Sequence, residues 1–139
     1  MIDCNNILEL VNQFEQEILP KEQWTHEAHL AVGCFYVFTY GKDVALEKIR
    51  VNIKKYNVAT GGENTTSSGY HETITVFWIW NIQRFLEKQP NKELKAFVKS
   101  FISSSFADKN QPFIYYSKDL LLSTQARLKF EFPDLLPFV

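Results

Sequence analysis

The sequence predicts an all-α fold, a single-domain helical bundle of five or six helices. Apolar residues recur at intervals of three and four along most of the chain, which is the periodicity of one buried helix face. No run of alternating β-branched residues is long enough to predict a strand, and no internal repeat is present. With 139 residues, of which 45% are hydrophobic and 22% charged, we expect one ordered domain over residues 1–139.

Two helices are predicted in the N-terminal part of the chain. The first runs over about residues 5–19 and would end at Pro20, which cannot continue a helix. Its apolar stripe consists of Ile7, Val11, Phe14 and Ile18. Thr25 is a favourable N-cap for the second helix, over about residues 26–40. That helix carries no charged residue over positions 29–40, so we expect it to be the buried centre of the domain.

The middle of the chain predicts two more helices joined by a polar loop. The third helix would end near Asn57, and its stripe consists of Leu46, Ile49, Ile53 and Tyr56. Residues 59–69 read A-T-G-G-E-N-T-T-S-S-G, which is too polar and too rich in glycine for regular structure. At this length a functional loop is favoured over a plain connector. Ser68 or Gly69 would then open a fourth helix over about residues 70–88.

The C-terminal part predicts one or two shorter helices and a tail. Asn91 is expected to cap a fifth helix, and Ser117 a shorter sixth one. The stripe of the fifth consists of Leu94, Phe97, Val98, Phe101 and Ile102, and the sixth lies around Leu121, Thr124 and Leu128. Pro133 and Pro137 predict that the tail is extended.

Charge and targeting signals narrow the classes of protein that the sequence fits. The formal net charge of -1 gives no overall attraction to nucleic acid or to an anionic membrane. We expect neither a secretory signal nor a membrane span, because no suitable apolar run is recognisable. The two cysteines, Cys4 and Cys34, lack C-x-x-C spacing and are expected to be free thiols. The sequence therefore predicts a cytoplasmic protein whose partner is a small molecule, and it leaves the oligomeric state open.

All three histidines lie in two short motifs at predicted helix starts. The first motif reads W-T-H-E-A-H-L and places His26 and His29 three residues apart, on one helix face. The second reads G-Y-H-E-T-I-T and contains His71. Short connections make successive helices antiparallel, so the second and fourth helices would start at the same end of the bundle. We therefore expect the two motifs to meet there and to form the functional site.

The chemistry of such a site follows from the form of the histidines. The positive end of a helix dipole favours neutral imidazole, which can bind a metal or accept a proton. His26, His29 and His71 together could hold a divalent ion such as zinc, iron or manganese. In an enzyme with or without a metal, His29, His71 and Glu72 would be the catalytic residues. Glu27 and Glu15 are further candidate partners, and a purely structural role for the histidines stays open.

Side chains near the motifs could form a pocket for a ring or an acyl group. The residues predicted to bind such a ligand are Trp24, Tyr36, Tyr70, Thr75 and Trp78. The aromatic ones would otherwise be core residues. Three functions remain open: a small enzyme with or without a metal, a non-catalytic module that binds a small ligand, and an interaction protein whose histidines are structural.

The two motifs resemble those of a group of small, largely uncharacterised bacterial helical proteins that carry W-T-H-x-x-H-L followed by G-Y-H-E-T-I-T. The resemblance extends to the tail, where L-L-S-T-Q-A-R is followed by F-P-D-L, so it spans nearly the whole chain. It implies a helical fold and no particular activity. A bundle with three clustered histidines is also similar to the DinB-like metal-binding bundles, although the H-x-x-x-H pair typical of those bundles is absent here.

Overall fold

The computed structural model describes residues 4–89 and 93–139, and within these ranges its regular elements are all helical. The long helices are α1 (Ile7–Glu15), α2 (His26–Tyr40), α3 (Lys42–Ala59), α4 (Glu72–Glu87) and α5 (Leu94–Ile102). The short helices are α6 (Pro112–Tyr115), α7 (Lys118–Leu121) and α8 (Thr124–Leu128), with the 3-10 turns η1 (Cys4–Asn6), η2 (Lys21–Gln23) and η3 (Ser105–Ala107). The predicted all-α fold is confirmed.

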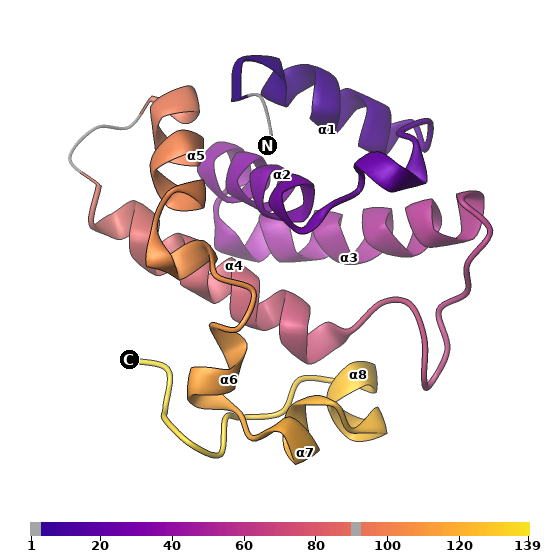
Figure 1. Cartoon of the computed structure of the whole chain (residues 1–139), viewed down its shortest axis with the longest axis vertical. Coiled ribbons are helices and arrows are strands. Elements are labelled where there is room, and N and C mark those ends of the chain that lie inside the picture. Colours follow the sequence, from indigo (N-terminus) through magenta and orange to yellow (C-terminus); the bar gives the residue numbers. More distant parts are fainter. Residues whose placement is uncertain (1–3, 90–92) are drawn as a thin grey trace.

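Helix α2 is the centre of the arrangement and packs against α1, α3, α4 and α5 (Figure 1). Its bounds are those predicted, because the hydroxyl of Thr25 caps the start by accepting a hydrogen bond from the N–H of Ala28 at 3.2 Å. Gly41, with a φ of +83°, ends it and lets α3 begin at the next residue. The uncharged run within α2 is mostly buried, as predicted.

Helix α1 ends at Glu15, so the predicted continuation to residue 19 is wrong. The N–H of Glu17 bonds to the carbonyl of Phe14, and the N–H of Ile18 to that of Gln13, which is the hydrogen-bond pattern of a Schellman cap. Glu17 takes the left-handed conformation, with a φ of +63°, that glycine usually supplies. This change of chain direction leaves Ile18 exposed and points the side chain of the next residue, Leu19, toward the core.

Helix α4 begins at Glu72 and is capped by His71, so the predicted start at Tyr70 after Ser68 or Gly69 is wrong. Gly69 has a φ of +81° and packs so closely against the loop that a Cβ would lie 2.1 Å from the carbonyl oxygen of Glu63. The chain therefore crosses this point as a loop.

The C-terminal part contains more short helices than predicted. Ser117 caps α7, as predicted, but the expected sixth helix is interrupted where Ser123 takes an extended conformation and caps a new helix, α8. Helix α6 was not predicted. The predicted cap Asn91 lies outside the described residues, and in the described part the side chain of Glu93 caps α5 by accepting from the N–H of Lys95.

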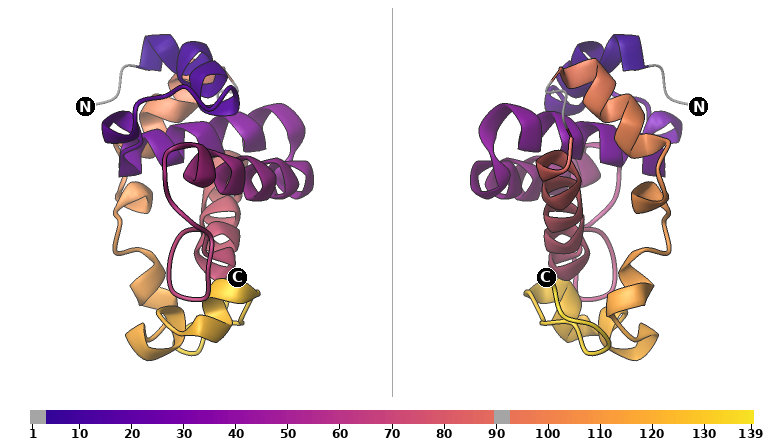
Figure 2. Two further views of the ribbon diagram at one scale, coloured as in Figure 1. Left: turned by 90° about the vertical axis from the view of Figure 1, so that its right-hand side faces the viewer. Right: turned by 90° about the vertical axis from the view of Figure 1, so that its left-hand side faces the viewer.

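The molecule has a main core and a smaller one. The main core surrounds α2, whereas the smaller one joins α4 to α6, α7 and the tail through Phe77, Tyr116 and Leu121. Phe138, in the tail, stacks on Trp80 with ring centroids 4.2 Å apart. Figures 1 and 2 show α7, α8 and the tail together at one end of the molecule, beside the start of α4. No helix among the described residues is both long enough and apolar enough to cross a membrane.

Candidate functional site

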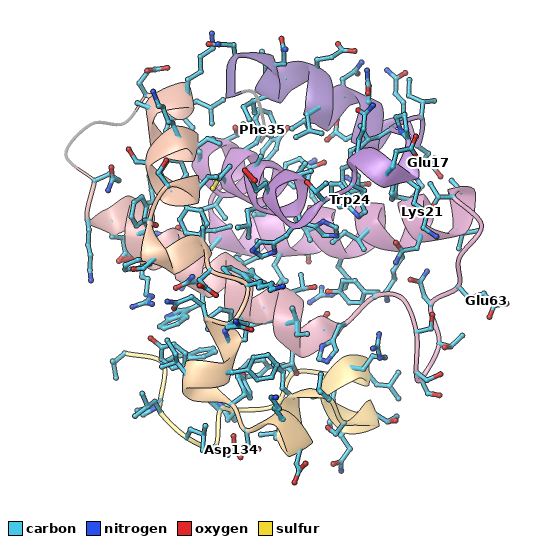
Figure 3. The ribbon with its side chains drawn as sticks, viewed as in Figure 1. Glu17, Lys21, Trp24, Phe35, Glu63 and Asp134 are labelled. Atoms are coloured by element: carbon cyan, nitrogen blue, oxygen red, sulfur yellow. The ribbon has the colours of Figure 1, made fainter. Side chains whose placement is uncertain are left out.

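A pocket of about 390 Å³ opens between α2, α3 and α4, and we name it the apolar pocket. The segment around the start of α2 contributes Trp24, His26, His29, Leu30 and Gly33. The other walls consist of isoleucines of α3 and α4, together with Thr75 and Trp78. A mostly apolar cavity of this size with a few polar groups is typical of a small-molecule site. Trp24 points into the molecule, whereas Glu63 and Asp134 lie at its edges (Figure 3).

His29 is the polar side chain of the apolar pocket with the most defined geometry. Its Nδ1–H donates a hydrogen bond to the carbonyl of Thr25 at 2.7 Å, so Nε2 carries the lone pair. The ring stacks on Trp24 with centroids 3.8 Å apart. The protein atoms packed around the ring of His29 shield it from water and so disfavour its charged form, and the charge of nearby His26 adds a smaller effect in the same direction. Together they lower the pKa of His29 to about 4. Although part of the residue is exposed, the ring is neutral at pH 7.

His26 lines the same pocket and also holds two elements together. Its Nε2 lies 2.8 Å from the carbonyl oxygen of Ala107, in η3, to which it donates a hydrogen bond. Its ring meets the ring of Trp78 edge-on, with centroids 5.4 Å apart. The bond leaves Nδ1 as the ring nitrogen of His26 that remains for a ligand.

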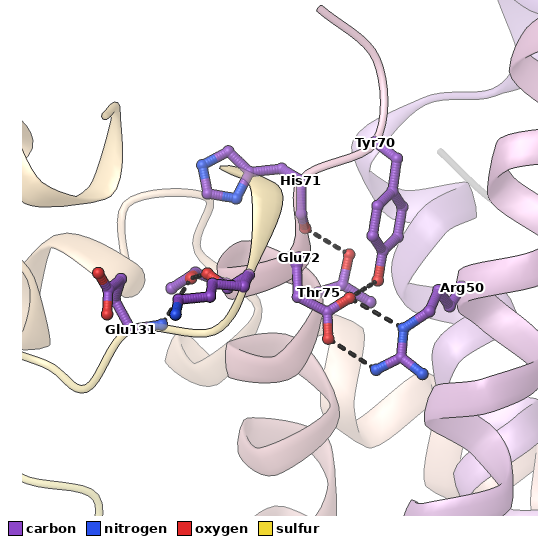
Figure 4. Close-up of polar contacts among 8 residues, drawn as sticks. Arg50, Tyr70, His71, Glu72, Thr75 and Glu131 are labelled. Carbon is purple, nitrogen blue, oxygen red and sulfur yellow. Dashed lines mark hydrogen bonds and ion pairs between the residues drawn. The ribbon is translucent and has the colours of Figure 1, made fainter. Parts of the chain in front are cut away.

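His71 lies elsewhere and has a structural role. Its Nδ1 accepts a hydrogen bond from the N–H of Ile74 at 3.1 Å, and its Nε2–H donates to the carbonyl of Leu121 at 2.7 Å. Both ring nitrogens are therefore occupied by the backbone. Burial, and to a smaller extent the charge of Arg127, lowers the pKa of His71. In Figure 4 its ring points away from Tyr70, and it is not among the residues that line the apolar pocket.

The structure thus brings His26 and His29 together but not His71. The N-cap position explains this, because a capping residue has extended backbone and its side chain does not lie on the helix stripe that follows. Within residues 4–89 and 93–139, no three or more His, Cys, Asp or Glu side chains are grouped so that they could hold a metal ion. The metal site of His26, His29 and His71 gains no support from this arrangement and stays a prediction.

Glu72 is held in an ion pair, away from the histidines of the apolar pocket. Arg50 Nε donates to Glu72 Oε1 at 3.0 Å and Nη2 to Oε2 at 2.6 Å, while the hydroxyl of Tyr70 donates to Oε1 at 2.6 Å (Figure 4). Burial would raise the pKa of the Glu72 carboxyl, but the bonds from Arg50 and Tyr70 outweigh it and hold this pKa below its usual value. Glu72 therefore lies apart from the apolar pocket and from His29, which was predicted to be catalytic together with it.

Tyr36, in the core, forms a separate pair with Glu15, which lies at the surface. The fully buried Tyr36 donates its hydroxyl to Glu15 Oε2 at 2.5 Å and accepts a hydrogen bond from Asn52 Nδ2 at 3.0 Å. Burial and the hydrogen bond to Glu15 raise the pKa of Tyr36. Neither residue lines the apolar pocket, and Glu27 does not line it either.

Of the five residues predicted to bind a ligand, Trp24, Thr75 and Trp78 line the apolar pocket. Tyr70 lines a second pocket, and Tyr36 is part of the core. The prediction missed the isoleucines of α3, which the sequence indicated only as one apolar stripe. It also missed Arg50, because nothing in the spacing of Arg50 and Glu72 indicates that they pair.

The two motifs do meet at the apolar pocket, although the second motif does so without His71. The first contributes Trp24, His26 and His29 to the apolar pocket, and the second contributes Ile74 and Thr75. No known protein family, no curated protein and no solved structure matches this chain.

Proposed function

We propose that this protein binds a small, mainly apolar molecule in the apolar pocket and that His29 accepts a hydrogen bond from that molecule. The observation that carries the proposal is the fixed, neutral ring of His29 at the wall of a 390 Å³ cavity. The bond to Thr25 selects the tautomer in which Nε2 is an acceptor, and the stacking on Trp24 sets the orientation of the ring.

The walls favour a ligand with an aromatic ring or a branched acyl group. Trp24 and Trp78 supply flat surfaces, and the isoleucines of α3 and α4 supply the remaining apolar contact. A polar group on the ligand would be placed near His29. The small net charge of the chain favours a small molecule over nucleic acid as the partner, and the cytoplasmic location predicted from the sequence belongs to this proposal.

Binding is better supported than catalysis. A general base works best when its pKa lies near the working pH, and a pKa of about 4 makes His29 a weak proton acceptor at pH 7. Glu72, the predicted carboxylate partner, is bonded to Arg50 and Tyr70 instead. If the protein is an enzyme, the second reacting group would therefore have to come from the ligand and not from Glu72.

Titration with 1-naphthol tests where the ligand binds. We expect quenching of tryptophan fluorescence, because Trp24 and Trp78 line the pocket. Ile53→Phe fills part of the cavity and should weaken binding at least fivefold, which is about 1 kcal/mol. The matched control is Val51→Phe on the same helix, because Val51 is exposed and does not line the pocket. Equal binding by the two variants would contradict the proposed location.

A second titration tests the role of His29. The wild type should bind 1-naphthol roughly threefold to tenfold more tightly than naphthalene, since one neutral hydrogen bond contributes about 0.5–1.5 kcal/mol. His29→Phe keeps a ring beside Trp24 but removes the acceptor, so the preference for 1-naphthol should disappear. A preference that is unchanged in His29→Phe would exclude His29 as the acceptor.

The metal version of the proposal has its own test. Metal analysis of the purified protein should detect zinc, iron or manganese in a stoichiometric amount. A site formed by His26, His29 and His71 should lose the metal both in His71→Asn and in the double variant His26→Ala/His29→Ala. Because both ring nitrogens of His71 are bonded to the backbone, binding of a metal through this ring first requires the loss of one of these hydrogen bonds. Wild-type protein without stoichiometric metal at neutral pH would rule this version out.

A further inference from the structure

A second pocket, of about 460 Å³, lies at the start of α4 between α3, the loop before α4, and the end of α8 with the residues that follow it. We name it the basic pocket because Arg50, Lys54, Arg127 and Lys129 line it, and because Glu72 is the single carboxylate among the described residues that does so. Four positive charges and one negative charge leave an excess of three positive charges. The whole chain has 15 basic and 16 acidic residues, so this excess is a local feature and not a consequence of composition.

The cations on the α8 side are placed by hydrogen bonds to the start of α4. Arg127 Nη1 donates to the carbonyl of Gly69 at 2.8 Å and to that of Tyr70 at 3.4 Å. The fully buried Thr73 donates its hydroxyl to the carbonyl of Lys129 at 3.0 Å and accepts from the N–H of Glu131 at 3.0 Å. These two hydrogen bonds hold the backbone that carries Lys129 beside α4.

Glu72 does not neutralise the pocket. Its carboxylate oxygens accept three hydrogen bonds, from Arg50 and Tyr70, which leave Arg50 Nη1 without a partner from Glu72. In the part of the chain that the structure describes, Lys54, Arg127 and Lys129 form no ion pair. The Nζ of Lys54 lies 5.1 Å from the ring centroid of Tyr70, at the wall of the pocket.

We propose that the basic pocket binds a phosphate group, either free or carried by a small molecule. A phosphate brings up to two negative charges and several acceptor oxygens, which suits two guanidinium groups and two ammonium groups around one cavity. The rings of Tyr70 and Phe130 form apolar wall beside the charges, where an organic part of the ligand would lie. This site is separate from the apolar pocket, and the proposal does not depend on what the apolar pocket binds.

Isothermal titration calorimetry with inorganic pyrophosphate, at constant ionic strength, tests the proposal. The site variant is Lys54→Gln/Lys129→Gln, which removes two charges that line the pocket. The matched control is Lys55→Gln/Lys99→Gln, which removes two exposed charges that do not line it. We expect one pyrophosphate per chain, roughly tenfold weaker binding by the site variant, and binding within about twofold of wild type by the control.

Two outcomes would overturn the proposal: no saturable binding of pyrophosphate by the wild type, or an equal loss in site variant and control, which would mean unspecific attraction. Amide chemical shifts locate the ion independently. Pyrophosphate should shift the signals of Thr65, Arg127 and Lys129, and shifts confined to other parts of the chain would also overturn it. If phenyl phosphate binds more tightly than inorganic phosphate, the ligand of the basic pocket is a phosphorylated small molecule. If the two bind equally, the ligand is free phosphate.

Discussion

His71 donates a hydrogen bond from Nε2 to the carbonyl oxygen of Leu121 at 2.7 Å and thereby joins the first turn of α4 to the end of α7. The same ring caps α4 through Nδ1. One side chain therefore satisfies two backbone groups, the N–H of Ile74 in the same turn and the carbonyl of Leu121, 50 residues further along the chain than His71. This arrangement holds the C-terminal helices beside α4, where Arg127 and Lys129 line the basic pocket.

His71→Ala should destabilise the protein by about 2–3 kcal/mol, as the sum of a lost N-cap and an unsatisfied buried carbonyl. His71→Asn keeps a capping oxygen and should cost about 1 kcal/mol less. Urea unfolding at pH 7 measures both. Binding of 1-naphthol should be unchanged in both variants, because His71 does not line the apolar pocket. Loss of that binding without loss of stability would instead assign His71 to the ligand site.

Stability should fall as the pH is lowered from about 6.5 towards 4. The pKa values of His29 and His71 lie below the ordinary value of 6.5 in the folded protein, so the unfolded chain binds more protons in this range. Protonation then favours unfolding, and the contribution of both groups is fully present only above pH 6.5. Urea midpoints measured from pH 7.5 to 4.5 test this. The double variant His29→Gln/His71→Asn should show a shallower pH dependence, and an unchanged slope would contradict the assignment.

The fold could be predicted where the sequence carries an explicit signal. Thr25 and Gly41 mark both ends of α2, and its uncharged run predicts its burial. The end of α1 carries no such signal, because Glu17 takes a backbone conformation in which glycine would be expected. Residue types alone therefore do not reveal that α1 ends two residues before Glu17.

The site was predictable in part, for a similar reason. The spacing of His26 and His29 places both on one face of α2, and the structure has both at the apolar pocket. The predicted helix over about residues 70–88 includes His71, because the sequence does not reveal that His71 is the capping residue itself. The pairing of Arg50 with Glu72 joins residues of α3 and α4, and only the packing of these two helices brings them together.

The ion pair of Arg50 and Glu72 should be measurable by a double-mutant cycle. The side chain of Arg50 is 35% exposed and that of Glu72 14% exposed, so the pair lies between the surface and buried classes. Arg50→Met and Glu72→Gln should each cost about 1–2 kcal/mol, with a coupling energy of about 1 kcal/mol. Urea is the suitable denaturant because it adds no salt. Additive losses would show that the pair contributes no net stability.

The loss of stability caused by substituting a glycine in the loop before α4 should depend strongly on the position of that glycine. At Gly69 a Cβ would lie 2.1 Å from the backbone oxygen of Glu63, and φ is +81°, so Gly69→Ala should cost about 2–4 kcal/mol. Gly61 has a similar φ of +93° but nothing within 4 Å of a Cβ, so the matched variant Gly61→Ala should cost only about 1–2 kcal/mol. Because Arg127 bonds to the carbonyl of Gly69, only Gly69→Ala should also weaken pyrophosphate binding. Equal effects of the two variants on stability and on binding would mean that the close packing of Gly69 shapes neither the loop nor the basic pocket.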